Sequence, residues 1–162
     1  MILYFAYGSN MSAVRMKQRL DWEAPRQSAS LENYQLVFNQ AGFNDPHWSP
    51  ANIMPSRGGL VEGIVYEVEE KDLQILDVHE KYYQRFEVDI LVSNGTSVKA
   101  ITYLSQNARE EKSPTREYLN FLLEAKELLS PEYFEGLNRI TVFSEDLLKQ
   151  KEIGRASCRE RV

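Results

Sequence analysis

A glycine turn close to the N-terminus contains residues that could bind or activate a substrate. A strand with a continuous apolar run ends at Tyr7-Gly8-Ser9-Asn10, and a helix is expected to follow over residues 12–20. This order of strand, glycine turn and helix start aims backbone N–H groups at one spot, where they can hold a carboxylate or polarise a carbonyl. The same residues would also suit a simple strand-to-helix turn, with Asn10 or Ser12 as the N-cap.

A second chemical feature is a carboxylate at the end of an apolar helix face. In the helix expected over residues 69–80, Leu73, Leu76 and Glu80 stand at i, i+3 and i+7, so all three point inward. Loss of hydration raises the pKa of a carboxylate towards that of a working general base. Glu80 could instead bend away to solvent, as most glutamates do. Asp72 and Asp77 lie on other faces of this helix and are expected to be solvated.

Other catalytic chemistries find little support in this sequence. The two histidines, His47 and His79, and the one cysteine, Cys158, do not have the spacing of a zinc site, so no metal is expected. His79 is either a neighbour of Glu80 that supports it or a surface residue at the helix end. Ser9 is not in a G-x-S-x-G turn, because Met11 stands where that motif needs glycine. Neither a G-x-G-x-x-G nor a P-loop pattern is present.

Composition restricts the partners and the compartment. The 162 residues carry a formal net charge of −5 with no basic block, which argues against nucleic acid as a partner. No apolar stretch approaches the roughly 20 residues that cross a bilayer, and the N-terminus lacks the features of a signal peptide. One cysteine fits a reducing compartment. We therefore expect a cytoplasmic protein with no membrane partner.

The pattern of apolar residues predicts an α+β fold. Asn94-Gly95 gives the strongest hairpin signal, and the loop over residues 40–55 is long enough to be a lid or a pocket wall. We expect a mixed, mostly antiparallel sheet curled into a partial barrel with flanking helices. The strands are expected over 2–7, 31–39, 51–53, 59–68, 86–92 and 98–104, the helices over 12–20, 69–80, 114–129 and 133–137, and a short extended piece over 140–143 before a terminal helix.

The end of the chain differs from the rest. Residues 1–152 are expected to form one domain, whereas residues 153–162 have no apolar period and resemble the translation of a ligated sequencing adapter. In that case the tail is not native, and Cys158 carries no information. The alternative is a genuine basic, disordered C-terminus.

Three segments together resemble the γ-glutamylcyclotransferase family. They are Tyr4-Phe5-Ala6-Tyr7-Gly8-Ser9-Asn10-Met11, Leu60-Val61-Glu62-Gly63-Ile64-Val65-Tyr66 and Leu76-Asp77-Val78-His79-Glu80. The resemblance implies a barrel-like α+β fold without a cofactor. It also implies attack of a γ-glutamyl α-amine on its own γ-carbonyl, which releases 5-oxoproline and an amine or amino acid. The catalytic glutamate of the family falls on Glu80, its substrate-binding loop on Tyr7, Gly8, Ser9 and Asn10, and a pocket tyrosine on Tyr118.

The residue after the catalytic glutamate departs from the family pattern. The family commonly has glycine at that position and a short loop before a tyrosine, whereas this chain has Lys81 and then Tyr82 and Tyr83. Tyr83 is taken as the substrate-binding equivalent, with Tyr82 as the alternative.

The sequence is compatible with three functions. They are a cyclotransferase for a small γ-glutamyl substrate, a non-catalytic binding module on the same scaffold, and a cyclotransferase for γ-glutamylamines. The sequence allows either a monomer or a homodimer.

Overall fold

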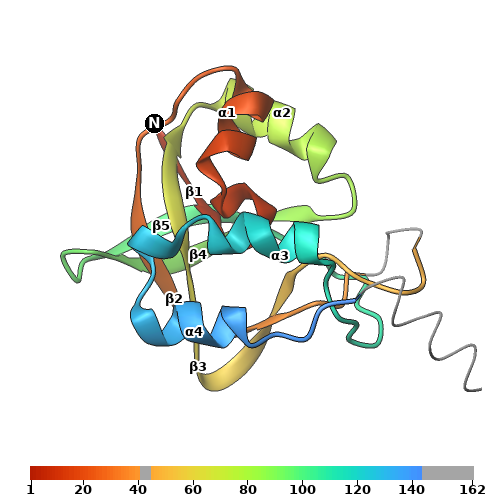
Figure 1. Cartoon of the computed structure of the whole chain (residues 1–162). Coiled ribbons are helices and arrows are strands. Elements are labelled where there is room, and N and C mark those ends of the chain that lie inside the picture. The colour runs from red at the N-terminus through yellow and green to blue at the C-terminus, as the bar shows by residue number, and fades with distance from the viewer. Residues whose placement is uncertain (41–44, 144–162) are drawn as a thin grey trace, which may run out of the picture.

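Five strands close into a barrel in the computed structural model, which describes residues 1–40 and 45–143. The order around the barrel is β1-β3-β2-β4-β5 (Figure 1). Strands β1 and β5 pair in parallel at Tyr4 and Ile101, and every other pairing is antiparallel. The predicted mixed, mostly antiparallel sheet is confirmed, although the barrel is closed rather than partial. The strands are β1 (Ile2–Ala6), β2 (Arg26–Val37), β3 (Asn52–Val68), β4 (Gln84–Val92) and β5 (Ser97–Leu104).

Strands β2 and β3 are longer than the local sequence predicts. They pair from Arg26 opposite Tyr66 to Val37 opposite Asn52, with a shift of register between Glu32 and Tyr34. The expected gap between strands at 51–53 and 59–68 does not exist, because β3 runs through it. Cross-strand pairing along β2 thus overrides the turn signals of the proline and glycines in this segment.

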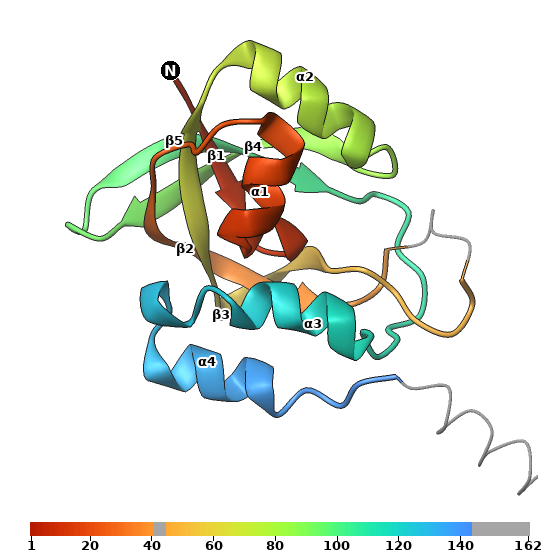
Figure 2. The ribbon, with the colours of Figure 1, turned by 45° about the horizontal axis from the view of Figure 1, so that its top comes forward.

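Four α-helices flank the barrel, and their caps explain where they begin. The side chains of Ser12, Thr115 and Ser130 each accept a backbone N–H from three residues further on, which fixes the starts of α1, α3 and α4. Figure 2 shows α1 between α2 and α3, with α4 beside α3. Helix α3 ends earlier than predicted, and a 3₁₀ turn at Lys126–Leu128 follows. The helices are α1 (Ala13–Leu20), α2 (Glu70–His79), α3 (Arg116–Leu123) and α4 (Pro131–Asn138).

Some expectations lie outside the described residues. These are the terminal helix after Phe143, the domain boundary at residue 152 and the tail with Cys158. Within the described ranges, no helix combines the length and the apolar character that a bilayer crossing requires.

The prediction that Asp72 is solvated is wrong, because its side chain has two partners that draw it inward. The residue is 1% exposed. One carboxylate oxygen accepts the Glu69 backbone N–H at 2.9 Å in a capping box, and the other accepts the Trp22 indole N–H at 3.0 Å. Asp72 therefore begins α2 and ties it to the end of α1.

Strand β1 approaches β3 closely, and this approach places the turn that follows β1. Tyr4, Phe5 and Ala6 are buried, as the apolar run predicts. A Cβ on Gly63 would lie 2.3 Å from the Ala6 carbonyl oxygen and 2.9 Å from the Phe5 ring. Since the nearest atom belongs to the backbone, only glycine fits here without moving the strand that leads into Gly8.

We therefore expect Gly63→Ala to lower the free energy of unfolding by about 1–3 kcal/mol, because β1 must shift to admit the methyl group. Gly136→Ala is the matched control: no atom lies within 4 Å of its added Cβ, and the position is in α4. That change should stabilise the protein by about 0.5–1 kcal/mol. Urea unfolding of both variants measures the difference, and equal stabilities would contradict the close-approach argument.

Candidate active site

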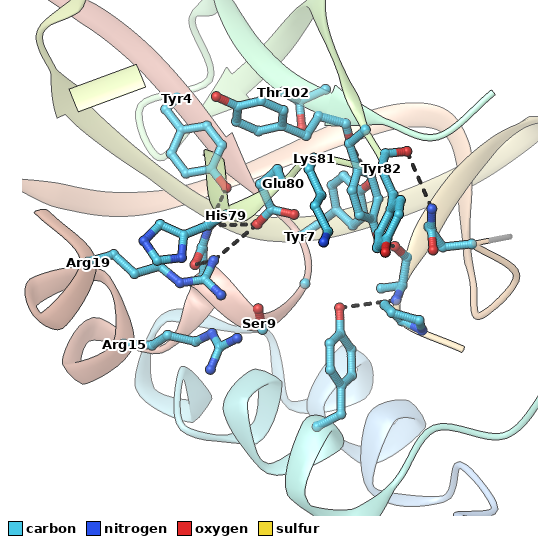
Figure 3. Close-up of a pocket in the computed structure, with 18 of the residues that line it drawn as sticks. Tyr4, Tyr7, Ser9, Arg15, Arg19, His79, Glu80, Lys81, Tyr82 and Thr102 are labelled. Atoms are coloured by element: carbon cyan, nitrogen blue, oxygen red, sulfur yellow. Dashed lines mark hydrogen bonds and ion pairs between the residues drawn. The ribbon is translucent and has the colours of Figure 1, made fainter. Parts of the chain in front are cut away.

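One pocket of about 300 Å³ brings the sequence-predicted residues together. It lies where the end of β1, the start of α1, the residues after α2, helix α3 and the segment before β3 meet (Figure 3). Its volume suits a small ligand held in a compact conformation. The lining includes all seven predicted residues, Tyr7, Gly8, Ser9, Asn10, Glu80, Tyr83 and Tyr118, and also Tyr4, Arg15, Arg19, Trp48 and Lys81.

The glycine turn is a single turn of 3₁₀ helix over Ser9–Met11, which leads into Ser12 as the N-cap of α1. The Met11 N–H bonds to the Gly8 carbonyl at 3.0 Å, and the Ser12 N–H bonds to the Ser9 carbonyl at 3.2 Å. These two bonds use N–H groups that follow the predicted loop of Tyr7, Gly8, Ser9 and Asn10, so the anion cradle expected of that loop stays a prediction. The turn also contributes the buried side chain of Asn10.

Glu80 caps the C-terminal end of α2 and points into the pocket. Its backbone N–H bonds to the Leu76 carbonyl at 2.8 Å, and Leu73 and Leu76 on the same face are buried, as the spacing predicts. The Glu80 side chain is 17% exposed. Burial raises the pKa of its carboxyl group above the ordinary value of 4.5, while Arg19 and Asn10 partly offset the rise.

Asn10 and Arg19 hold the Glu80 carboxylate from two sides. The Asn10 amide N–H and the Arg19 guanidinium each donate to Glu80 Oε1 at 3.2 Å. Arg19 also donates to Asn10 Oδ1 at 2.9 Å, so the three side chains form a closed ring of contacts. Arg19 was not among the predicted site residues. The sequence did carry a signal for it, because Arg15 and Arg19 stand four residues apart on one face of the helix that follows the turn.

The pocket tyrosines differ in the direction of their hydrogen bonds. Tyr7 donates its hydroxyl proton to the Tyr103 carbonyl at 2.5 Å, and Tyr83 donates to the Ala51 carbonyl at 2.6 Å. Tyr118 instead accepts the Ala51 backbone N–H at 3.0 Å. Burial raises the pKa of Tyr118 to about 12, so its hydroxyl is protonated at neutral pH. Tyr118 can thus donate to a ligand, whereas the protons of Tyr7 and Tyr83 are already used.

Tyr4 resembles Tyr118 in this respect, although it was predicted only as part of the motif at residues 4–11. Its hydroxyl accepts the Asn10 amide N–H at 2.9 Å, while burial and the nearby Glu80 raise its pKa well above 10.0. The phenol is therefore a second neutral donor beside the carboxylate.

The loop before β3 forms one wall of the pocket, as its length suggests. Trp48, Pro50 and Ala51 line the cavity, and the Trp48 ring centroid lies 5.7 Å from that of Tyr118. Arg109 holds this segment from behind by donating to Ser49 Oγ at 2.7 Å and to the carbonyls of Asp45 and Trp48.

His79 is the only histidine of the pocket lining, and it is exposed. Partial burial and the charges of Arg19 and Arg15 lower its pKa. Across residues 1–40 and 45–143, no three His, Cys, Asp or Glu side chains are grouped so that they could hold a metal ion.

Comparison with known proteins shows the family of this chain. The family model for gamma-glutamyl cyclotransferase, AIG2-like, matches residues 4–121. A gamma-glutamylcyclotransferase of Homo sapiens is 33% identical over 147 residues, which cover 85% of this chain and 78% of the human protein. A solved structure of a gamma-glutamyl cyclotransferase superposes with a TM-score of 0.79 at 29% identity, covering 92% of this chain and 98% of the other.

A more distant structure shares the same fold. It is that of YkqA from Bacillus subtilis, which superposes with a TM-score of 0.74 at 26% identity over 88% of this chain and 56% of the other. The chain therefore belongs to the gamma-glutamyl cyclotransferase, AIG2-like family, and both its fold and its relatives are those of a cyclotransferase enzyme.

The close contact between Gly8 and Tyr118 yields a testable expectation. A Cβ on Gly8 would lie 2.9 Å from the Tyr118 hydroxyl oxygen, so Gly8→Ala should push that hydroxyl away from the Ala51 N–H. The loss of this hydrogen bond should lower the free energy of unfolding by about 1 kcal/mol. In a Tyr118→Phe background the same change should cost much less, since the oxygen is gone. Urea unfolding of the four proteins measures the coupling, and strictly additive effects would contradict it.

Arg19 should set the protonation of Glu80. Its charge and hydrogen bond favour the ionised carboxylate, so Arg19→Met should raise the Glu80 pKa further. The carboxylate would then stay protonated to a higher pH than in the unaltered protein. Carbon-13 NMR titration of the Glu80 carboxyl measures the shift, with the exposed Lys17→Met on the same helix as the control. An unchanged Glu80 titration in Arg19→Met would show that the contact has no electrostatic effect.

Proposed function

We propose that the protein cyclises a γ-glutamyl group to 5-oxoproline and releases an amine or amino acid, with Glu80 as general acid and base. The observation that carries this proposal is a mostly buried carboxylate of raised pKa, fixed beside the glycine turn in a small pocket. Family membership supports the class of reaction.

The proton transfers of such a reaction need one group that acts in both directions. The α-ammonium of the substrate must lose a proton before its nitrogen can attack the γ-carbonyl carbon. Glu80 takes this proton so that the free amine can form the new C–N bond, and it returns a proton to the leaving nitrogen as the old C–N bond breaks. A carboxyl group whose pKa lies closer to neutrality than that of an ordinary glutamate suits both steps.

The developing oxyanion needs a neutral donor, and Tyr118 is our candidate for that role. Its hydroxyl oxygen accepts the Ala51 N–H, so its own proton is available to the γ-carbonyl oxygen. A pKa of about 12 keeps the phenol protonated throughout the reaction. Such a donor, held in place before the reaction, stabilises charge only as it develops.

Ring closure also requires the γ-glutamyl chain to fold back on itself. A pocket of about 300 Å³, walled by Tyr7, Tyr83 and Trp48, favours this bent conformation over an extended one. A pocket that holds the amine next to the carbonyl lowers the entropic part of the barrier to ring closure, because the reacting groups are already in position. We therefore propose that Tyr7, Ser9 and Tyr83 shape the pocket rather than move protons.

A second candidate function is a binding module without catalysis, and the Arg19 contact is the observation that favours it. A guanidinium 3.2 Å from Glu80 Oε1 stabilises the ionised carboxylate and weakens it as a base. The neighbouring Lys81 adds a further cation to the pocket lining. Calorimetry distinguishes the two functions, because a module would bind a γ-glutamyl ligand and leave it unchanged.

We also propose that the protein acts in the cytoplasm as a monomer or homodimer. One cysteine in 162 residues suits a reducing compartment. Light scattering after size-exclusion chromatography gives the oligomeric state, and cell fractionation gives the compartment.

Glu80→Gln is the decisive variant for the proposed reaction. Glutamine keeps the shape of the side chain and an acceptor for Asn10 and Arg19, but it cannot take a proton. We expect 5-oxoproline release from a panel of γ-glutamyl amino acids and amines to fall about 10²–10⁴-fold. Mass spectrometry of the product measures the loss. The exposed Glu67→Gln in β3 serves as the control.

Two results would contradict this assignment. Turnover by a folded Glu80→Gln at the rate of the unaltered protein would remove Glu80 as the base. Binding of the whole panel by the unaltered protein, with no 5-oxoproline formed, would favour the binding module.

A further inference from the structure

The pocket contains more positive charge than its one carboxylate can balance. Among the described residues that line it, Arg15, Arg19 and Lys81 are cations, and Glu80 is the only acid. Arg19 is already paired with Glu80. Two cations therefore remain, and they differ in how they are held.

Arg15 is the cation that the fold fixes in place. It comes from α1, and its guanidinium carbon lies 4.4 Å from the centroid of the Phe121 ring of α3. This stacking leaves the edge of the planar guanidinium, which carries its N–H groups, free to meet a ligand. Lys81, by contrast, is exposed after α2, and its ammonium lies over the Tyr82 ring.

The side-chain donors of Arg15 have no hydrogen-bond partner in the part of the chain that the structure describes. Its Nε atom is buried without an acceptor. No ion pair or side-chain hydrogen bond ties the guanidinium to any described residue. A buried donor without a partner is costly, so the arrangement suits a site that a ligand completes.

Arg15 also stands close to the groups proposed to carry the reaction. Its charge lowers the pKa of both Glu80 and Tyr118, against the rise that burial causes. Figure 3 shows its guanidinium beside Ser9, on the same side of the pocket as Arg19. A ligand group that meets Arg15 therefore lies next to both the base and the phenol.

We propose that Arg15 binds the α-carboxylate of the γ-glutamyl group, an inference that rests on the proposed function. The carbon that bears the reacting amine also bears this carboxylate. A substrate with its amine at Glu80 must then place the carboxylate close by, where an arginine can bind it through two parallel N–H···O bonds. Arg15 is favoured over Arg19 for this role, because Arg19 already pairs with Glu80 and donates to Asn10.

Three substrates separate the possible sources of the carboxylate. γ-Glutamyl-alanine carries one carboxylate on the glutamyl group and another on the leaving group. γ-Glutamyl-ethylamine carries only the first, and 4-aminobutanoyl-ethylamide, which closes to 2-pyrrolidinone, carries neither. We expect Arg15→Met to lower kcat/KM about 10- to 100-fold for the first two substrates, the usual effect of losing charged hydrogen bonds, and to leave the third nearly unchanged.

Control variants test whether Arg15 is merely structural. Lys17→Met removes an exposed cation from the same helix, and Phe121→Leu removes the ring beneath Arg15. If Arg15 only stabilises the fold, Arg15→Met lowers the unfolding temperature and affects all three substrates alike. A loss confined to γ-glutamyl-alanine would place the leaving group's carboxylate at Arg15. Either result overturns the proposal.

Product binding tests the same contact without turnover. 5-Oxoproline keeps the α-carboxylate, and 2-pyrrolidinone is the same ring without it. Calorimetry should show about 10- to 100-fold weaker 5-oxoproline binding to Arg15→Met, with 2-pyrrolidinone unaffected. If no substrate yields product but this difference in binding appears, the proposed reaction fails and the carboxylate site stands. If product forms but Arg15→Met binds 5-oxoproline as tightly as the unaltered protein, the carboxylate site is refuted and the proposed reaction stands.

Discussion

The side chain of Asn10 is the point at which the two halves of the site are joined. Its amide donates to Tyr4 and to Glu80 and accepts from Arg19, while its backbone carbonyl accepts the Tyr66 hydroxyl at 2.7 Å. These partners come from β1, the end of α2, α1 and β3. A short polar residue thus fixes a carboxylate, a cation and a phenol around one amide. Burial makes each contact costly to break, because little water is available to replace a lost hydrogen bond.

The same network acts on the protonation of the buried Glu80 side chain. Burial raises the pKa of the Glu80 carboxyl group, whereas Arg19 and Asn10 lower it and so partly offset the rise. The protein therefore adjusts one proton affinity with elements that are far apart in the sequence. Neither the helix that carries Glu80 nor the turn beside it could do this alone.

Local patterns were sufficient to predict some of this molecule, and the reasons are physical. Leu73, Leu76 and Glu80 repeat at helical spacing, and Asn94-Gly95 permits few structures other than a hairpin, so both predictions are confirmed. The continuous β3 was missed because its register with β2 comes from the partner strand rather than from its own residues. Asp72 was misjudged because its indole partner, Trp22, lies 50 residues away. Arg19 escaped notice for a similar reason, since a surface arginine and one that binds a buried carboxylate look alike in sequence.

The parallel pairing of β1 with β5 has a consequence for how the protein folds. It joins Tyr4 to Ile101, so the barrel closes only when segments about a hundred residues apart have met. Local contacts within α1, α2 and the β4–β5 hairpin can form early, but they do not bring Asn10 to Glu80. Contacts of such sequence separation slow folding, because chain entropy is lost before they form. The pocket is therefore a late product of folding, and its chemistry is absent until the first strand has found its place beside the last.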